Sequence, residues 1–495
     1  MNIIKVDHEI PLILIFGLGE TGISVALWYA RRNFRLRIAD TRYHLEHLNK
    51  SFAENLKNVE VEYLLGESIY NTKLLDGVSK LVISPFFSPK RSARKIIGEA
   101  SLLHIEIISE IEIFSRALIE LKIKKNYDPV ILAITGTNGK TTVTSLTGKL
   151  VAASGLSVII AGNIGPSALW ALMKAMDRNE LPKVWVLELS SFQLYDLKSL
   201  MPTAAILLNL SEDHLDWHGS MDEYCECKIR LLKMAKIAFI NRDDPIISSM
   251  VYKTGKTEIK SFGTNLPNLV GDMGIKLGKN GLSWLSICDF KKNKKLKKNT
   301  IVNQLVPLKS LKIQGMHNAL NALAALQLTE ILNRFRKSRI KSLIQYSGEP
   351  HRLNFICTHE GIDYVNDSKS TNIASTIAAL KSIQKKVILI LGGLSKGQDF
   401  SLLIDIVKYH AKGIILIGKD SQSIENSLRR SGILCIKSSD LSQAVKASNN
   451  IAMPGNTILL SPACSSKDMF QSYSHRGQIF VNEVLNFIAN QNKKH

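Results

Sequence analysis

The 495-residue sequence contains no apolar run long enough to span a membrane. A membrane-spanning helix needs roughly 20 predominantly apolar residues in a row. The apolar run PLILIFG (11–17) near the amino end is much shorter and leads directly into a glycine motif. This end also lacks the small-residue cleavage site of a signal peptide. We therefore expect a cytoplasmic protein whose first β-strand lies at this run.

Cysteine is scarce, and the six cysteines, at positions 225, 227, 288, 357, 435 and 464, show no repeated pair spacing. A structural zinc site usually shows two close pairs of Cys or Cys/His ligands. Only Cys225 and Cys227 lie close together, and a single residue separates them. The spacing favours reduced, partly buried thiols over a metal site. The sequence also shows no zinc finger and no RNA-recognition signature.

Acidic residues are outnumbered, with 43 Asp and Glu against 64 Lys and Arg, which gives a net charge of +21. Such an excess suggests polyanionic partners: nucleic acid, a membrane surface or phosphorylated small molecules. The lysines are dispersed except in KKNKKLKKN (291–299), which follows a strand-like segment. We interpret this run as a solvated loop rather than a binding patch. Without a nucleic-acid signature, phosphorylated small molecules are the expected partners.

No internal repeat of 20 to 50 residues is evident, so the sequence does not indicate a solenoid. Apolar strand-like segments alternate with helical ones along the whole chain, which is typical of α/β domains with parallel sheets. The polar stretch LKIKKNYDP (121–129) predicts a linker. We predict three α/β domains: a Rossmann-like domain over 1–115, a central P-loop domain with a parallel sheet over 116–348, and a Rossmann-like domain over 349–495. The predicted strands include PLILIFG, FRLRIAD, VEVEYLL, KLVISP, IEIISEIEIF, SVIIAG, KVWVLELS, TAAILLNL, IAFINR, KVILILGG, GIILIG and TILLSPAC.

The segment ITGTNGKTT (134–142) predicts a phosphate-binding loop, because it follows an apolar strand and precedes a helical segment. Gly136 and Gly139 allow backbone N–H groups to turn towards an anion, and the helix N-terminus favours negative charge. Lys140 would neutralise the β- and γ-phosphates of ATP, and the Thr141 hydroxyl would ligate Mg²⁺. Ile134 occupies the position of the first glycine of the general P-loop pattern.

A second glycine motif, GLGETG (17–22), also follows a strand, and Asp40 stands 18 residues beyond Gly22. Taken alone, this spacing is typical of a dinucleotide-binding domain whose acid binds the ribose, as in an NAD-linked dehydrogenase. With an ATP loop in the same chain, the alternative is a different nucleotide substrate held by its diphosphate. Fold analogy does not decide between them.

These and further motifs, in this order along nearly the whole chain, resemble those of the Mur ligases, the ATP-dependent amide-forming enzymes of peptidoglycan precursor synthesis. The GLGETG and DTR (40–42) pair and SPAC favour the member that adds D-glutamate. The other matching motifs are GNIG (162–165), LELSSFQL (187–194), LNLSEDHLDWHGSMDEYCECK (208–228), GMHNALNALAAL (315–326), HRL (351–353), NDSKSTN (366–372) and LLSPACSSKDMF (459–470).

The resemblance implies a two-step reaction on UDP-N-acetylmuramoyl-L-alanine. ATP would phosphorylate its carboxylate, and the amine of D-glutamate would attack the acyl phosphate through a tetrahedral intermediate. Such chemistry relies on positioning and charge neutralisation. It also implies ATP, two Mg²⁺ ions and a monomer in the cytoplasm, active in cell-wall biogenesis and thus in cell shape and division.

Lys228 is of special interest. On a helix it shares a face with Met221, Tyr224, Cys225 and Leu232, so it projects with the apolar residues. A desolvated lysine becomes a usable nucleophile, whereas a lysine that extends its amine back to water is the alternative. In the family the matching lysine reacts with CO₂ to form a carbamate that serves a second Mg²⁺.

The resemblance assigns the remaining site residues. Lys140, Glu188, His214 and Lys228 would carry catalysis, and Thr141, Glu188, His214 and carbamylated Lys228 would bind metal. ATP would contact Gly136, Thr137, Asn138, Gly139, Lys140, Thr141, Thr142, Asn318, Asn321, Arg352 and Asp367, with Lys369 in the same motif as Asp367. The UDP substrate would contact Gly17, Gly19, Thr21, Asp40, Thr41, Arg42, Asn163 and Ser190. D-glutamate would contact Thr371, Lys396, Ser466 and Tyr473.

Three positions depart from the family pattern: SPFF (84–87) replaces Ser-Pro-Gly, Lys467 replaces an apolar residue and Tyr473 replaces Phe. Two alternatives therefore stay open. One is a sibling ligase adding another amino acid, or a folate polyglutamylating ligase. The other is an NAD-binding regulatory protein with an accessory ATPase.

Overall fold

The structure is a computed structural model that divides into two compact units. The first comprises residues up to Leu210 with Trp217–Val306 and Ala322–Leu343, and the second comprises Ser211–Asp216, Pro307–Asn321 and the chain from Ile344 onwards. The described residues are 10–44, 54–66, 72–85, 87–251, 255, 257–290, 300–313, 315–333, 336–395 and 397–492.

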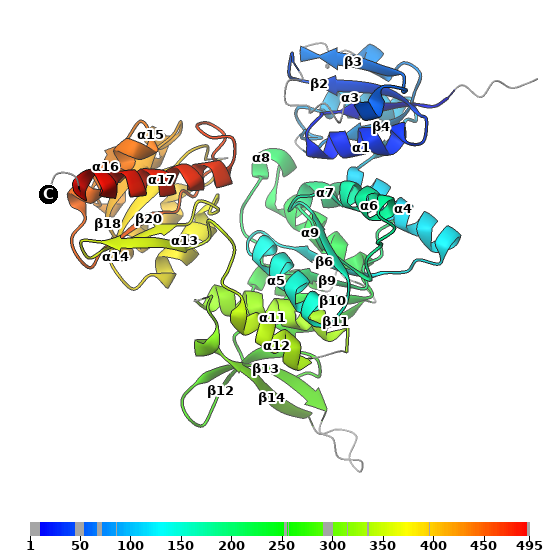
Figure 1. Ribbon diagram of the computed structural model, residues 1–495. Coiled ribbons are helices and arrows are strands. Elements are labelled where there is room, and N and C mark those ends of the chain that lie inside the picture. Colours follow the sequence, from blue (N-terminus) through cyan, green and yellow to red (C-terminus); the bar gives the residue numbers. More distant parts are fainter. Residues whose placement is uncertain are drawn as a thin grey trace, which may run out of the picture. The chain divides into compact units, whose positions relative to one another are not determined.

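The first sheet has five parallel strands in the order β3-β2-β1-β4-β5 (Figure 1). Alternate residues of β1 serve two cores: Ile13 and Ile15 pack with helices α1 and α4, whereas Leu14 and Phe16 pack with α3. The elements are β1 (Leu12–Phe16), α1 (Glu20–Ala30), β2 (Arg35–Asp40), β3 (Val61–Leu65), η2 (Thr72–Leu75), β4 (Val78–Ile83), α3 (Arg94–Leu102), β5 (Glu106–Ile108) and α4 (Glu110–Lys125).

The central sheet has nine strands in the order β14-β13-β12-β11-β10-β9-β6-β8-β7. In this spatial order, all neighbouring strands from β12 to β7, including β6, pair in parallel. Strands β12 and β13 pair antiparallel. Its strands are β6 (Val130–Thr135), β7 (Val158–Gly162), β8 (Val184–Glu188), β9 (Ala204–Leu207), β10 (Ile237–Asn241), β11 (Glu258–Phe262), β12 (Met273–Leu277), β13 (Ser283–Phe290) and β14 (Thr300–Pro307). The intervening helices are α5 (Lys140–Ala153), α6 (Ala168–Asp177), α7 (Ser191–Tyr195), α8 (Leu215–His218), α9 (Met221–Met234) and α10 (Pro245–Met250).

The third sheet has six strands in the order β15-β16-β20-β17-β18-β19. Along β17, Val387, Leu389 and Leu391 face the helices α13 to α15, and Ile388 and Ile390 face α16 and α17 (Figure 1). This alternation explains the uninterrupted apolar sequence of the strand, because both faces are covered. The strands are β15 (Asn354–His359), β16 (Ile362–Asn366), β17 (Val387–Gly392), β18 (Ala411–Ile417), β19 (Cys435–Lys437) and β20 (Thr457–Leu460).

The remaining helices complete the chain from the end of the central sheet to the carboxyl end. They are η4 (Leu308–Ser310), α11 (Met316–Glu330), α12 (Arg336–Gln345), α13 (Ile373–Ser382), η5 (Phe400–Leu403), α14 (Ile404–His410), α15 (Ser421–Leu428), η6 (Arg429–Ser431), α16 (Leu441–Ile451) and α17 (Tyr473–Asn492). None of the helices among the described residues has the length and apolar composition needed to cross a bilayer.

Three-domain α/β architecture is confirmed, but two local predictions are wrong. The segment IEIISEIEIF is a strand only over β5, because Ser109 accepts a hydrogen bond from the Glu112 N–H and starts α4. That helix continues to Lys125, so the first part of the predicted linker 121–129 is helical. The predicted boundary at residue 115 therefore falls within α4, and the loop 291–299 lies outside the described residues.

Trp185 on β8 is fully buried and generates a stability prediction. Its ring packs edge-on against Phe114, and its Nε1–H donates to the Tyr127 hydroxyl at 2.9 Å. Trp185→Ala should destabilise the first unit by about 3–5 kcal/mol, because it opens a cavity and removes this hydrogen bond. Urea unfolding followed by circular dichroism measures the effect. Trp185→Phe, which keeps most of the packing, should cost much less; equal losses in the two variants would contradict this account.

Candidate functional site

The phosphate loop joins the end of β6 to the start of α5, as predicted. Gly136 has a φ of +153°, and a side chain there would approach Leu208 to 2.9 Å. Gly139 adopts the left-handed conformation with φ of +83° at the N-cap of α5. Asn209, which follows β9, holds the loop by accepting from the Thr137 N–H and, through Oδ1, from the Asn138 N–H at 2.8 Å. Gly136 is therefore required by close packing against Leu208, and Gly139 by its left-handed backbone conformation.

Lys140 lies across its own loop. Its Nζ donates to the Gly136 carbonyl at 2.8 Å and to the Thr137 carbonyl at 2.9 Å. Thr141 and Thr142 are buried in the first turn of α5. Thus the predicted ATP contacts from Gly136 to Thr142 form one continuous cradle at a helix N-terminus, the arrangement that favours bound phosphate.

Glu188 is the last residue of β8. In the sheet it pairs with Ile134 of β6, the strand that leads into this loop. The carboxylate is 1% exposed, and Oε1 accepts from Asn163 Nδ2 at 2.7 Å. Oε2 is buried and has no hydrogen-bond partner among the described residues. A buried carboxylate oxygen without a partner is unfavourable unless a cation or donor reaches it. Ser190, the other predicted substrate contact here, caps α7 by accepting from the Gln193 N–H.

A divalent cation fits this arrangement. Mg²⁺ prefers oxygen ligands and keeps water and phosphate ligands, so it needs only one or two protein groups. The Glu188 oxygen without a hydrogen-bond partner and the hydroxyl of Thr141 are oxygen ligands that the protein can offer to such an ion.

Lys228 is buried, with 1% exposure, which confirms the prediction from the apolar face of α9. Its Nζ donates to the Gly136 carbonyl at 2.8 Å and to Thr135 Oγ1 at 3.4 Å. It also lies 4.8 Å from the ring centre of Tyr224, whose hydroxyl is 2.9 Å from Thr137 Oγ1. The lysine amine therefore contacts the first turn of the phosphate loop instead of extending to water.

All six cysteines are free thiols, as predicted. Burial raises the pKa of both Cys225 and Cys227 to about 11, so both are protonated near neutral pH.

In the glycine motif of the first sheet, Asp40 organises its own loop. Oδ2 accepts from the Leu18 N–H at 2.6 Å, and both oxygens accept from the Arg42 guanidinium. Burial alone would raise the pKa of Asp40, but the hydrogen bonds from Arg42 and Leu18 hold it below its usual value. Because both oxygens are already engaged, Asp40 is not a free acceptor for ribose hydroxyls, and Arg42 is fixed beside the loop.

The SPFF departure touches the same loop. Phe87 packs edge-on against Phe16, and a side chain at Gly17 would come within 2.9 Å of the Phe87 ring. Gly17 has a φ of +98°, which favours glycine. Thr21 and Thr41 lie on α1 and just after β2, so the predicted contacts Gly17, Gly19, Thr21, Asp40, Thr41 and Arg42 gather at the carboxyl edge of the first sheet.

The second unit contains the other predicted metal ligand, His214, which has a φ of +56° and lies 3.6 Å from Asp213 Oδ2. Asp213 also accepts from Asn372 Nδ2 at 3.3 Å. His214 is thus attached to the NDSKSTN motif, and its role as a metal ligand stays a prediction.

The predicted nucleotide contacts of the second unit form two groups. Asn321 donates to Asn318 Oδ1 at 3.2 Å on α11. Asp367 accepts from the Leu353 N–H at 3.1 Å and from the Ser370 and Ser461 hydroxyls, which joins HRL to the motif after β16. Arg352 Nε is buried without a partner among the described residues.

Three of the predicted D-glutamate residues lie in the loops after β16 and β20 and at the start of α17. Arg476, which is fully buried, joins these loops by donating to Ser368 and to the Cys464 carbonyl. Lys369 Nζ lies 3.8 Å above the Tyr473 ring. The residues concerned are Thr371, Ser466 and Tyr473. The fourth, Lys396, lies outside the described residues.

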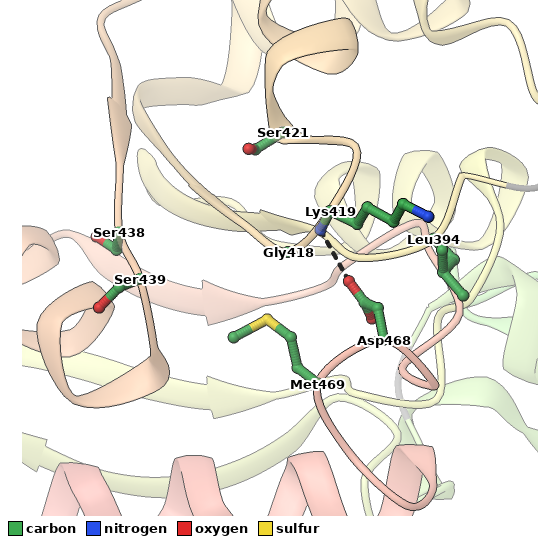
Figure 2. Close-up of a pocket in the computed structure, with 8 residues that line it drawn as sticks. All are labelled: Leu394, Gly418, Lys419, Ser421, Ser438, Ser439, Asp468 and Met469. Atoms are coloured by element: carbon green, nitrogen blue, oxygen red, sulfur yellow. Dashed lines mark hydrogen bonds between the residues drawn. The ribbon is translucent and has the colours of Figure 1, made fainter.

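A cavity of about 750 Å³ opens beyond the carboxyl ends of β17, β18 and β19 (Figure 2). Asp468 Oδ2 accepts from the Lys419 N–H at 2.9 Å across its wall. Its lining residues are Leu394, Gly418, Lys419, Ser421, Ser438, Ser439, Asp468 and Met469. Sequence reasoning did not predict these residues as site residues, although Asp468 and Met469 belong to the same loop as Ser466.

Comparison with known proteins identifies the family. Residues 11–109 match the N-terminal domain of MurD-like Mur ligases, residues 134–329 match the Mur ligase middle domain, and residues 351–464 match the glutamate ligase domain of Mur ligases. These matches cover most of the sequence, and the chain therefore belongs to the Mur ligase family. It is an ATP-dependent ligase.

Curated relatives carry a more particular name. The chain is 47% identical over 490 residues to the UDP-N-acetylmuramoylalanine--D-glutamate ligase of Bordetella avium, with 96% of each chain covered. It is 40% identical over 498 residues to the protein of that name from Paraburkholderia xenovorans, covering 98% of this chain and 97% of the relative.

Solved structures share the fold. The MurF ligase of Thermotoga maritima in complex with ADP matches with a TM-score of 0.57 at 16% identity, over 91% of this chain and 95% of that one. The UDP-N-acetylmuramate-alanine ligase MurC of the same organism matches with a TM-score of 0.56 at 15% identity, over 96% and 99%.

Asp367 gives a pH prediction. Burial raises its pKa from 3.8 to about 6, although hydrogen bonds from Ser370, Ser461 and Leu353 oppose the shift. Between these values the unfolded chain has released the proton that the folded state still holds. The stability that Asp367 contributes is therefore lost as the pH rises from about 4 to about 6. The loss is on the order of 3 kcal/mol, and above this range the contribution of Asp367 no longer changes with pH.

Asp367→Asn cannot ionise and should lack this slope. Thermal unfolding of both proteins between about pH 4 and about pH 7 measures the difference, and only its change with pH matters, because the substitution itself adds a constant offset. Parallel stability profiles for the two proteins would show that the carboxyl group is ionised throughout.

Proposed function

We propose that this protein adds D-glutamate to UDP-N-acetylmuramoyl-L-alanine in cytoplasmic peptidoglycan precursor synthesis, with hydrolysis of ATP to ADP and phosphate. The observation that carries the proposal is the position of buried Lys228 and Glu188 beside the phosphate loop, in a chain 47% identical over 490 residues to a ligase named for this reaction. The loop, the acid and the lysine all come from one chain, so a monomer suffices.

In the first step the substrate carboxylate attacks the γ-phosphorus of ATP, the bond to the β-γ bridging oxygen breaks, and ADP leaves. Backbone N–H groups of residues 139–141, at the start of α5, would bind the phosphates, and Lys140 would exchange its two loop carbonyls for phosphate oxygens. When bound, Mg²⁺ neutralises charge on the transferred phosphoryl group. Glu188 would hold one ion with Thr141, and His214 and carbamylated Lys228 would hold the second.

In the second step the amine of D-glutamate attacks the acyl carbon. The C–N bond forms, the amine loses a proton, and the tetrahedral intermediate collapses as the bond to the phosphate oxygen breaks. Thr371, Lys396, Ser466 and Tyr473 are proposed to bind D-glutamate, and Lys396 would pair with a carboxylate. Asn318, Asn321, Arg352 and Asp367 would bind ATP, which requires closure of the domains during the cycle.

The uridine nucleotide is assigned to the first sheet, through Gly17, Gly19, Thr21, Asp40, Thr41 and Arg42, with Asn163 and Ser190 near the muramoyl group. Both Asp40 oxygens accept from Arg42 and Leu18, so Asp40 would contribute by orienting Arg42. Arg42 would then face an anionic group of the substrate.

Amino-acid specificity provides the first test. Phosphate release from ATP with UDP-N-acetylmuramoyl-L-alanine should require D-glutamate, with at least ~100-fold lower kcat/KM for L-glutamate, L-alanine, L-lysine or diaminopimelate, because the unmatched polar groups of the pocket would stay unpaired. Turnover with another of these amino acids and not with D-glutamate would assign the chain to a sibling activity. NAD binding with no amino-acid-dependent phosphate release would support the regulatory alternative.

Lys228→Ala provides the second test. We expect kcat to fall by at least ~100-fold, because an anionic ligand of the site is lost. Added bicarbonate should not restore activity, whereas short carboxylic acids that fill the space should restore part of it. Lys233→Ala is the matched control, because Lys233 lies on the same helix and is exposed, and it should keep full activity. Full activity of Lys228→Ala would refute the carbamate role.

A further inference from the structure

His218, at the end of α8, is a buried histidine that the proposed reaction does not use. It is 1% exposed, and its ring stacks on Phe192 with an interplanar angle of 17°. Its Nε2 lies 2.9 Å from Ser191 Oγ, and its Nδ1 lies 3.9 Å from Cys227 Sγ. The imidazole therefore joins the first residue of α7 to the middle of α9.

Both ring nitrogens face a side chain that can donate or accept a hydrogen bond. Nε2 faces the Ser191 hydroxyl at 2.9 Å, and Nδ1 faces the Cys227 thiol at 3.9 Å. The contact with Ser191 is the shorter one, so it is the main polar link between α8 and α7.

Both connected segments carry residues of the proposed site. Ser191 lies three residues after Glu188, and Cys227 directly precedes Lys228. The Tyr224 ring packs edge-on against His218 at 5.4 Å between ring centres, and the Tyr224 hydroxyl lies 2.9 Å from Thr137 Oγ1 in the phosphate loop. The imidazole therefore contacts a serine three residues after Glu188, a cysteine directly before Lys228, and the tyrosine whose hydroxyl reaches the phosphate loop.

We propose that His218 is a positioning residue that sets the Lys228 helix against the phosphate loop and Glu188 through the hydrogen bond between its Nε2 and Ser191 Oγ. The inference rests on the proposed function, since it assumes that the Lys228 amine and the loop act on the same reaction. A displacement of about 1 Å at a reacting group costs on the order of 100-fold in rate, so a link of this kind matters for catalysis even though His218 touches no substrate.

Two substitutions distinguish the two ring nitrogens. His218→Gln can place an amide N–H near the position of Nε2 and keep the bond to Ser191, whereas the shorter His218→Asn reaches only the position of Nδ1. His218→Phe keeps the ring and loses both bonds. We expect kcat to fall ~10- to 100-fold in the Phe and Asn variants and to recover to within several-fold of wild type in the Gln variant.

If His218 had only a structural role, the loss of activity in each variant would follow its loss of stability. Thermal unfolding of every variant is therefore measured in parallel. Cys225→Ala is the matched control, because Cys225 is buried in the apolar core on the same helix, two positions before Cys227 and therefore on a different helix face. Cys225→Ala should lower the melting temperature and keep kcat. Equal losses of kcat in the Gln and Asn variants, or unchanged kcat in His218→Phe, would overturn the proposal.

Binding of ADP with Mg²⁺, followed by calorimetry, gives a readout without turnover. The Phe and Asn variants should bind ADP several-fold more weakly than wild type, and the Gln variant should bind it like wild type. This comparison separates the two proposals, because it needs no D-glutamate. If wild type binds ADP but D-glutamate gives no phosphate release, the proposed function fails while the ADP affinities still decide the role of His218. Equal ADP affinity in all variants would overturn the positioning role.

Discussion

The hydrogen bond from Lys228 Nζ to the Gly136 carbonyl is the interaction on which the central site depends. It requires a lysine on the apolar face of α9, a loop residue without a side chain, and close packing of that loop against Leu208 and Asn209. A buried ammonium group is tolerated only when its hydrogen-bonding capacity is met. The loop thus has two functions: its N–H groups suit an anion, and its first carbonyl serves a cation from a different helix.

All three sheets share one structural arrangement. Each places polar loops at the carboxyl ends of parallel strands, and central strands such as β1 and β17 are buried on both faces. In the first sheet this edge carries Asp40 and Arg42, in the central sheet the phosphate loop and Glu188, and in the third Asp367 and Ser466. The reacting groups therefore rest on rigid strands, while the connecting loops determine what each sheet recognises.

Local patterns predicted much of this arrangement from sequence. The strands around the phosphate loop are short apolar runs bounded by glycine, and helical spacing alone predicted that Lys228 is buried. The segment IEIISEIEIF was misread because its acids alternate with apolar residues as in a strand. In the structure Glu110 and Glu112 are buried helical acids that accept from the N–H groups of Leu169, Lys198 and Ser199, partners far away in sequence. Tertiary hydrogen bonds of this kind leave no local signal.

The same limit explains what was missed in the site. The spacing from Gly22 singled out Asp40, and only the structure shows that its oxygens accept hydrogen bonds from Arg42 and Leu18. Likewise His218 contacts Ser191 of a separate motif, and Arg476 joins the loops after β16 and β20. The predicted ligand contacts stand in recognisable motifs, whereas residues that hold those motifs together are identified by their three-dimensional neighbours.

The burial of Lys228 has a consequence for reagents that modify amines. Most lysines of this strongly basic chain can meet solvent, but Lys228 is enclosed by the Tyr224 ring and the phosphate loop. Bulky or charged acylating agents are excluded by size and by the loss of their hydration, whereas a small uncharged electrophile such as CO₂ is not. Chemical labelling of surface amines would therefore pass over this residue, and the enclosure itself selects which modification it can receive.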